Sequence, residues 1–238
     1  MFPYDDAIVS VVRRDPQTVS DVLQTMQAID DTCADTDGLK WFNWLYFQVT
    51  QAIKARLDAG GFTDPTWLAR LDVVFAQFYF NALEAALTGC PTPGCWQAMF
   101  SARSDTAITR IQFALAGMNA HINHDLCQAI VRTCRATGRP LQHATAQYSD
   151  YTSVNTTLDG MIQSAKQTLA VRLPGASTPP ISQLQNVIAA FDISVAREHA
   201  WNTAEVLSVL PDTATAPLLE FINGITAALG KSLLVPIP

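Results

Sequence analysis

Apolar residues recur at helical spacing along nearly the whole chain. Positions i, i+3, i+4 and i+7 fall on one face of a helix, so this pattern is typical of helices that bury one side. Residues that begin or end helices interrupt it, such as Asp37 and Asp64-Pro65 before apolar runs and Gly89 and Gly138 after them. No series of alternating strand-like segments appears. We therefore predict an all-α fold, a single-domain bundle of about seven or eight helices over residues 1–238.

The helix boundaries follow from turn and capping residues. Pro16 stands after Asp15, where a proline at the first helical position begins a helix. Leu173–Pro180 is rich in Pro, Gly, Ser and Thr and is predicted to be an internal linker. The predicted helices cover roughly residues 16–31, 38–59, 65–88, 96–100, 105–137, 151–171, 181–210 and 217–234.

Composition narrows the classes of partner. Hydrophobic residues make up 49% of the 238 positions and charged residues only 15%, so the chain can bury a large core and still line a cavity or cover a second subunit. A homo-oligomer is therefore one candidate assembly. The formal net charge of −6 and the scattered basic residues disfavour a nucleic-acid partner, which needs a basic face.

The sequence also bears on the compartment. No run of about 18 apolar residues predicts a membrane span, and the acidic start of the chain lacks the features of a signal peptide. The five cysteines have neither zinc-site spacing nor an even count, so we interpret them as reduced thiols. We expect a cytoplasmic protein.

Polar residues interrupt the helix predicted over 105–137. Asn119 and Asn123 fall inside its apolar stripe, while His121 and Asp125 lie on the opposite side at i,i+4 spacing. A solvated face is the simplest interpretation of that side. However, residues 113–118 are apolar all round, and Gly117 and its neighbouring alanines allow another helix to approach closely. We therefore expect His121 and Asp125 to be buried.

The helix predicted over 181–210 carries a second group of polar residues. Glu198, His199 and Asn202 project from the apolar stripe, and Asp192 lies at its edge. Burying such groups unpaired costs roughly 2–7 kcal/mol each, so they need partners or a wet cavity. They form either a hydrogen-bonded network that ties two helices together or the wall of a cavity. The apolar stripe of this predicted helix consists of Leu184, Val187, Ile188, Phe191, Val195, Val206 and Val209.

Two further helices contribute candidates. Asp72 lies at the edge of the apolar stripe of the helix predicted over 65–88, and Tyr79 lies in that stripe. Asp72 is a candidate base, or a partner for Arg70 or a tyrosine. The aromatic residues of the helix over 38–59 either belong to the core or line an apolar pocket of the kind that binds small molecules.

These residues suggest two chemistries. His121-x-x-x-Asp125 has a spacing used by metal sites on helices, and His124, His199 and Glu198 could complete a set of ligands for a divalent metal. Paired Glu-x-x-His motifs are absent, so no cofactor is firmly predicted. Without a metal, a His–Asp pair is a general acid–base unit. The candidate catalytic residues are His121, Asp125, Glu198 and His199, and the candidate substrate-binding residues are Asn119, Asn123, Asn202, Asp72 and Tyr79.

Two segments carry a family resemblance. Arg70 to Leu83 and Gln112 to Leu126, the latter with its Asn-Ala-His-Ile-Asn-x-Asp-Leu motif, resemble a bacterial family of uncharacterised proteins, the domain of unknown function numbered five-nine-nine-five. The resemblance covers roughly residues 35–205. It implies a helical fold and implies that Asn119, His121, Asn123 and Asp125 belong to the family's signature. It implies no activity.

Three functional hypotheses remain. The first is an enzyme of the hydrolase, lyase or cyclase type, for example one recruited to a biosynthetic pathway, that acts on a small, largely apolar molecule in the bundle. The second is a non-catalytic binding protein for such a molecule, whose polar cluster recognises the ligand's head group. The third is an interaction protein whose polar cluster only fixes helix register. A dry core with every polar group paired would favour the third hypothesis.

Overall fold

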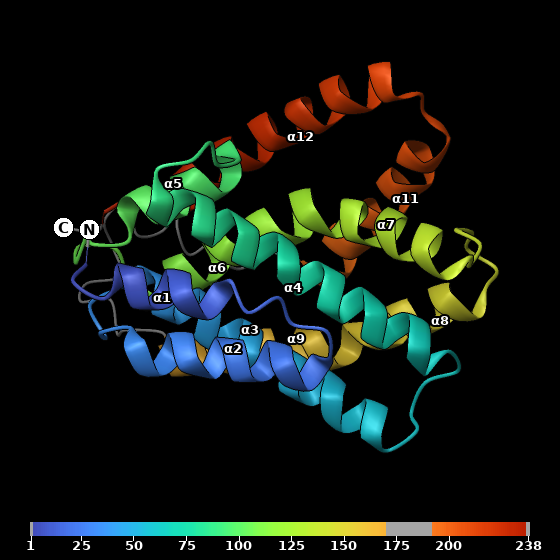
Figure 1. Ribbon diagram of the computed structural model, residues 1–238, viewed down its shortest axis with the longest axis horizontal. Helices are drawn as coiled ribbons and strands as arrows, with labels where there is room; N and C mark the ends of the chain where they lie inside the picture. The colour runs from blue at the N-terminus through green and yellow to red at the C-terminus, as the bar shows by residue number, and fades with distance from the viewer. Residues whose placement is uncertain (1, 170–191, 237–238) are drawn as a thin grey trace.

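Helices supply the regular secondary structure of the computed structural model, which describes residues 2–169 and 192–236. This confirms the predicted all-α bundle (Figure 1). In chain order the helices are α1 (Asp5–Val12), α2 (Val19–Thr32), α3 (Gly38–Asp58), α4 (Pro65–Thr88), α5 (Gly94–Ala102), α6 (Arg110–Ala120), the π-helix η1 (His121–Asp125), α7 (Leu126–Thr137), α8 (Ala146–Ser153), α9 (Asn155–Leu169), α11 (Ile193–Val209) and α12 (Asp212–Leu233).

Capping residues set the ends of the two helices that were predicted most closely. The Asp37 carboxylate accepts a hydrogen bond from the Leu39 backbone N–H at the start of α3. At the start of α4, where Pro65 is the first helical residue, the Asp64 carboxylate accepts a hydrogen bond from the Trp67 backbone N–H. Gly89 ends α4 in the left-handed conformation, with φ of +73°, which glycine adopts without steric strain.

Other predicted boundaries were wrong. Pro16 does not begin a helix, because Thr18 caps α2 in a capping box with Asp21. Helix α1 was not predicted. The last helix begins at Asp212 rather than Pro217, so that proline lies inside α12. The predicted linker Leu173–Pro180 and residues 181–191 of the next predicted helix lie outside the described residues.

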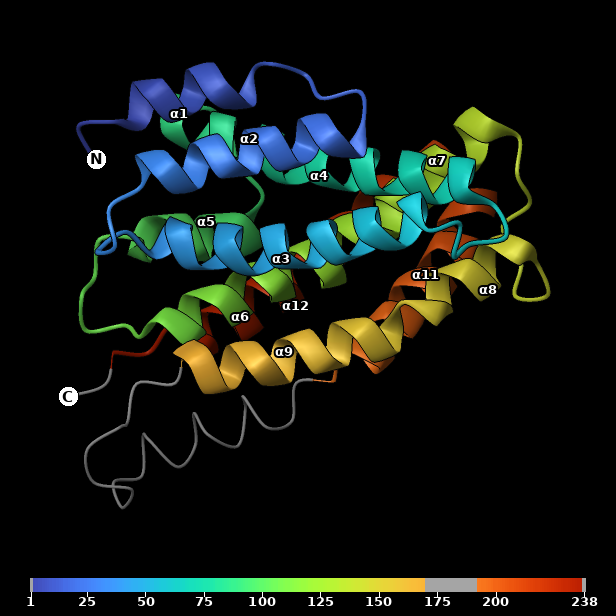
Figure 2. The same cartoon turned by 90° about the horizontal axis from the view of Figure 1, so that it is seen from below.

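Helix α6 is the central helix of the bundle. Every residue from Ile111 to Ala120 is buried, as the apolar run predicted. Figure 2 shows α1 and α2 on one side of α3, with α6 and α9 on the other. Where α3 crosses α6, a Cβ atom on Gly117 would collide with the ring of Phe42, so the glycine is required for this close approach. The contact confirms the predicted role of Gly117.

The C-terminal helices complete the bundle. Helix α11 packs against α7, and α12 packs against α5 and α6 (Figure 1). None of the described helices is both long and apolar enough to span a membrane.

Candidate functional site

A single π-helical turn lies at the centre of the bundle. Residues His121–Asp125 form η1 between α6 and α7, so the helix that was predicted as continuous widens at the His-Ile-Asn-His-Asp segment. Such turns are rare and often occur at functional sites, because they reorient side chains within an otherwise regular helix. Here the turn holds two imidazoles against one carboxylate.

Asp125 accepts three hydrogen bonds within this turn and from α5. Its Oδ2 atom lies 3.0 Å from His121 Nδ1 and accepts a hydrogen bond from Trp96 Nε1 at 2.9 Å. Its Oδ1 atom lies 2.7 Å from His124 Nδ1. Burial raises the pKa of Asp125, but the hydrogen bonds from the two histidines outweigh burial and hold that pKa below its ordinary value. Asp125 is therefore ionised, and it fixes the proton of each imidazole on Nδ1.

The other nitrogen of His121 has no partner among the described residues. His121 Nε2 is buried and makes no hydrogen bond to the described part of the chain. The imidazole ring of His121 stacks on the ring of Phe75, with 3.4 Å between the ring centroids. The Tyr46 ring lies edge-on to the imidazole, with 4.7 Å between their centroids. Burial lowers the pKa of His121 against the opposing attraction of Asp125. The imidazole is thus neutral near pH 7, with an available lone pair on Nε2.

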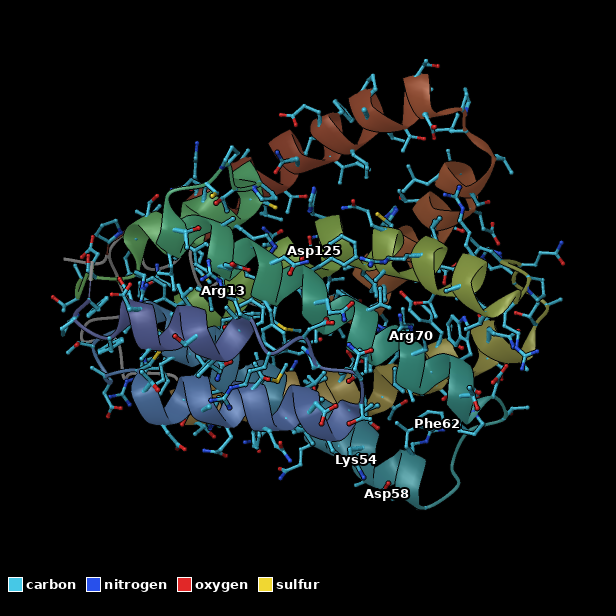
Figure 3. The ribbon with its side chains drawn as sticks, viewed as in Figure 1. Arg13, Lys54, Asp58, Phe62, Arg70 and Asp125 are labelled. Carbon is cyan, nitrogen blue, oxygen red and sulfur yellow. The ribbon has the colours of Figure 1, made fainter. Side chains whose placement is uncertain are left out.

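His121 opens onto a mainly apolar cavity, here named the His121 cavity. Its volume is about 50 Å³, enough for a few water molecules or a small organic group. Side chains from α3, α4, α6, η1, α7, α9 and α11 line it. They are Tyr46, Val49, Ile53, Leu68, Leu71, Asp72, Phe75, Met118, His121, Ile122, Leu126, Val154, Leu158, Ile193 and Arg197. Figure 3 shows Asp125, which supports His121, inside the bundle.

Asp72 lies in the same cavity as His121. Its Oδ2 atom is buried and has no hydrogen-bond partner among the described residues. Burial raises the pKa of Asp72 to about 7, so both protonation states are populated at neutral pH. No ion pair with Arg70 appears in the described ranges, which excludes one of the two partnerships considered from the sequence.

Tyr46, rather than Tyr79, lines the cavity. The prediction that Tyr79 contacts a substrate is not supported by its position, because its hydroxyl donates to Asn43 Oδ1 at 3.4 Å within the core. Tyr46 is one of the aromatic residues of α3 that were expected either to belong to the core or to line an apolar pocket, and its buried hydroxyl lies near the buried Thr50 hydroxyl. Their i,i+4 spacing on one helix was the signal that sequence reasoning missed.

The predicted orientation of α11 was wrong. His199 and Asn202 are exposed and Glu198 is half-buried, so none of them projects into the core. Asp192 lies outside α11 and caps it, accepting hydrogen bonds from two backbone N–H groups. The predicted stripe relied on valines that prove to be exposed: Val195, Val206 and Val209. The opposite side of α11 is buried instead. Its buried residues are Ile193, Arg197, Ala200, Trp201, Ala204 and Leu207.

Glu198 belongs to a surface cluster. Its carboxylate lies 3.1 Å from His143 Nε2 and accepts a hydrogen bond from the Tyr148 hydroxyl at 2.8 Å. The Nδ1 atom of His143 lies 2.9 Å from Glu205. Sequence reasoning did not identify His143, because the loop between α7 and α8 brings it to α11.

The two asparagines of the signature face α12. Asn119 Nδ2 donates to the Thr226 carbonyl at 2.9 Å, and Asn123 Nδ2 donates to Asn119 Oδ1 at 2.9 Å. With His199 they line a groove between α11 and α12 that is separate from the His121 cavity. The structure therefore does not place them where they could bind a substrate beside His121.

The predicted metal ligands do not all come together. His121 and His124 both bond to Asp125 inside the bundle, whereas Glu198 and His199 lie in the surface cluster and the α12 groove. Within residues 2–169 and 192–236, no group of three or more His, Cys, Asp or Glu side chains is arranged to hold a metal ion.

Comparison with known proteins identifies a family but no activity. Neither a curated protein nor a solved structure matches the chain. The model of a family described as "Family of unknown function (DUF5995)" matches residues 19–236, a range that includes η1 and all the helices lining the His121 cavity. Since the match extends over nearly the whole chain, the protein belongs to this family of unknown function.

Proposed function

We propose that the protein is an enzyme that acts on a small, largely apolar molecule in the His121 cavity by acid–base chemistry. One observation carries the proposal. His121 presents to an apolar cavity a buried Nε2 atom that has no hydrogen-bond partner in the described chain, while Asp125 holds its Nδ1 proton. This is the arrangement of a general base backed by a carboxylate.

The two titratable groups of the cavity have complementary roles. Neutral His121 accepts a proton at Nε2 from the substrate or from a water molecule, and Asp125 stabilises the imidazolium that forms. Asp72, with its pKa near 7, donates a proton to the developing negative charge of the substrate. A carboxyl group whose environment shifts its pKa toward neutrality, as burial does for Asp72, is suited to such a transfer.

The cavity favours certain reactions. Its apolar walls exclude bulk water, which strengthens the electrostatic interactions of the few polar groups inside. Removing a proton at one point and supplying one at another accomplishes an elimination, an isomerisation or the attack of a bound water. A lyase or hydrolase type therefore fits the site best.

The two alternatives account for fewer of the observations. A purely structural network would pair its polar atoms, yet His121 Nε2 and Asp72 Oδ2 are buried without partners in the described chain. Leaving such groups unsatisfied destabilises a fold, so their retention favours a role with a ligand. A binding protein would use the same atoms but has no need of a carboxyl group with a pKa near 7.

A cytoplasmic location is part of the proposal. All five cysteines are free thiols, which agrees with a reducing compartment.

The proposal is tested with a panel of small substrates. Purified protein is incubated with short-chain esters, β-hydroxy acids and ketones, and products and deuterium incorporation from D₂O are followed by NMR. His121→Ala and Asp72→Asn are each expected to lower turnover by about 10²–10⁴-fold, the usual contribution of a general acid or base. His199→Ala is the matched control, because His199 is exposed and lies outside the cavity.

The outcomes separate the hypotheses. Turnover that survives in both His121→Ala and Asp72→Asn would overturn the assigned roles. Ligand binding without turnover of any panel member would identify a binding protein. Elemental analysis of wild type and His121→Ala addresses the metal: a stoichiometric metal that is lost in the variant would replace metal-free chemistry by metal-assisted chemistry.

A further inference from the structure

A buried cation that forms no ion pair with a described carboxylate lines the His121 cavity. Arg197 of α11 is only 7% exposed. Its Nε atom donates to Asn155 Oδ1 at 2.7 Å and its Nη2 atom to the Tyr151 carbonyl at 2.7 Å, while the guanidinium lies over the Tyr151 ring. Among the described residues, no Asp or Glu forms an ion pair with it.

Arg103 shows what a structural buried arginine looks like in this protein. It is equally buried, at 6% exposure, but forms ion pairs with both Asp5 and Asp37. Those two carboxylates compensate for the lost hydration of the guanidinium. Arg197 has neutral oxygens and an aromatic face instead, and Asp159 acts on it only at a distance, without an ion pair. Among the described residues its positive charge is hydrogen-bonded but has no carboxylate in contact, an arrangement that an anionic ligand would stabilise.

We propose that Arg197 binds a carboxylate of the substrate, so that the protein acts on small apolar carboxylic acids. This inference rests on the proposed function and names its substrate class. Arginine has five N–H donors in a planar fork that matches a carboxylate, and the two hydrogen bonds described above leave donors available. The apolar part of the substrate fits the aliphatic walls of the cavity, and its reacting carbon lies toward His121.

A carboxylate fits better than a phosphate group. A phosphate dianion needs several donors, whereas the other walls of this small cavity are mainly apolar. Asp72, the carboxyl group in the same cavity, can be neutral near pH 7, so a bound carboxylate does not have to share the cavity with a second full negative charge. Ionised Asp72 opposes binding, which gives the inference a second, independent test.

Calorimetric titration with two pairs of probes tests the inference. Butanoate and hexanoate are each compared with the primary alcohol of the same chain length. Wild type is expected to bind each carboxylate at least about tenfold more tightly than its alcohol, since hydrogen bonds to charged groups contribute differences of this order. Arg197→Met is expected to remove this preference and leave alcohol binding unchanged. His121→Ala is expected to keep the preference.

A second variant covers the case in which Arg197→Met does not fold. Asp72→Asn breaks no hydrogen bond between Oδ2 and a described residue, and it removes the competing negative charge. At pH 8 it is expected to tighten carboxylate binding severalfold and to leave alcohol binding unchanged. Carboxylate affinity that does not change in this variant would overturn the inference.

The results distinguish the inference from the proposed function. If carboxylates and alcohols bind wild type alike, or neither binds, Arg197 is not a carboxylate anchor, and the turnover panel still judges the acid–base proposal. If the carboxylate preference is lost in Arg197→Met and kept in His121→Ala, the anchor stands even where no panel member is converted.

Discussion

Two clusters in this protein pair histidine with carboxylates, one inside the bundle and one on its surface. His121 and Asp125 have side chains that are 1% and 2% exposed. His143, which lies between Glu198 and Glu205, is 43% exposed, and the two glutamates are 41% and 32% exposed. The two His–carboxylate distances are similar, at 3.0 Å between His121 Nδ1 and Asp125 Oδ2 and 3.1 Å between His143 Nε2 and Glu198 Oε1.

Their pKa shifts have opposite directions. Burial lowers the pKa of His121 despite the adjacent Asp125, whereas the hydrogen bond to Glu198, with Glu205 nearby, raises the pKa of His143. Hydration explains the difference, because the imidazolium is stable only where water or charge can solvate it. A His–carboxylate contact by itself therefore does not identify a base. Only the buried cluster provides a neutral imidazole with an available lone pair beside a cavity.

The largest expected difference between the clusters concerns stability. Asp125→Ala leaves Trp96 Nε1 and the Nδ1 atoms of His121 and His124 buried without an acceptor. The free energy of unfolding is expected to fall by about 3–5 kcal/mol, the usual effect of breaking a buried charged network. Urea denaturation followed by circular dichroism measures it. Glu205→Ala in the surface cluster is the control, with an expected loss below about 1 kcal/mol. Equal losses would show that burial does not separate the two clusters.

The second difference is a pH dependence due to Asp72. Its pKa rises from 3.8 to about 7 on folding, so its contribution to stability is fully present below pH 3.8 and is lost as the pH rises through 7. Asp72→Asn is therefore expected to be more stable than wild type at pH 8, by up to about 4 kcal/mol, and no more stable at pH 4. Denaturation at the two pH values tests this.

The surface carboxylate Glu198 provides the contrast. Burial raises its pKa, but hydrogen bonds from Tyr148 and His143 outweigh burial and lower it. Glu198→Gln is thus expected to lose a little stability at pH 8, below about 1 kcal/mol. A gain of stability at pH 8 in both variants would mean that the difference between them does not come from burial of the carboxyl group.

Local signals in the sequence predicted much of the fold and the burial of His121 and Asp125. Capping residues such as Asp37 and Asp64 act within one helical turn, so the sequence around them was sufficient to place α3 and α4. The all-round apolar run before His121 correctly indicated burial on every side. Both predictions depended on neighbours in the sequence alone.

The errors arose where packing between distant segments decides the outcome. Helix α11 buries the side that carries Ala200 and Trp201 against the neighbouring helices and leaves its valines exposed. The prediction from periodicity took the face with the valines as the buried face, and it therefore wrongly placed Glu198 and His199 in the core. The meeting of Asp72, Tyr46 and Arg197 with His121 depends on four separate helices, and no local pattern contains that information.

The third prediction is the titration of the two histidines. In an NMR titration of imidazole-labelled protein, His121 is expected to titrate below the ordinary value of 6.5 and His143 above it. His121→Gln and His143→Gln assign the two signals. Removing Glu198 by Glu198→Gln should lower the pKa of His143 and leave that of His121 unchanged. An imidazole of His121 that remains protonated at pH 7 would contradict its assignment as a base.

The smallest expected effect is the stability of the surface cluster itself. The pKa of His143 is raised on folding, so the stabilisation it provides is present below its unfolded value of about 6.5 and is lost as the pH rises through the folded value. His143→Gln is therefore expected to lower the free energy of unfolding at pH 5.5 by less than about 1 kcal/mol and to have no effect at pH 9. Added salt should weaken the effect at pH 5.5, because exposed charges are screened, whereas the cost of Asp125→Ala should be largely insensitive to salt. Denaturation at low and high ionic strength compares the two variants directly. An equal response to salt would mean that water reaches both clusters, and His121 would then lose the dry environment on which its role as a neutral base depends.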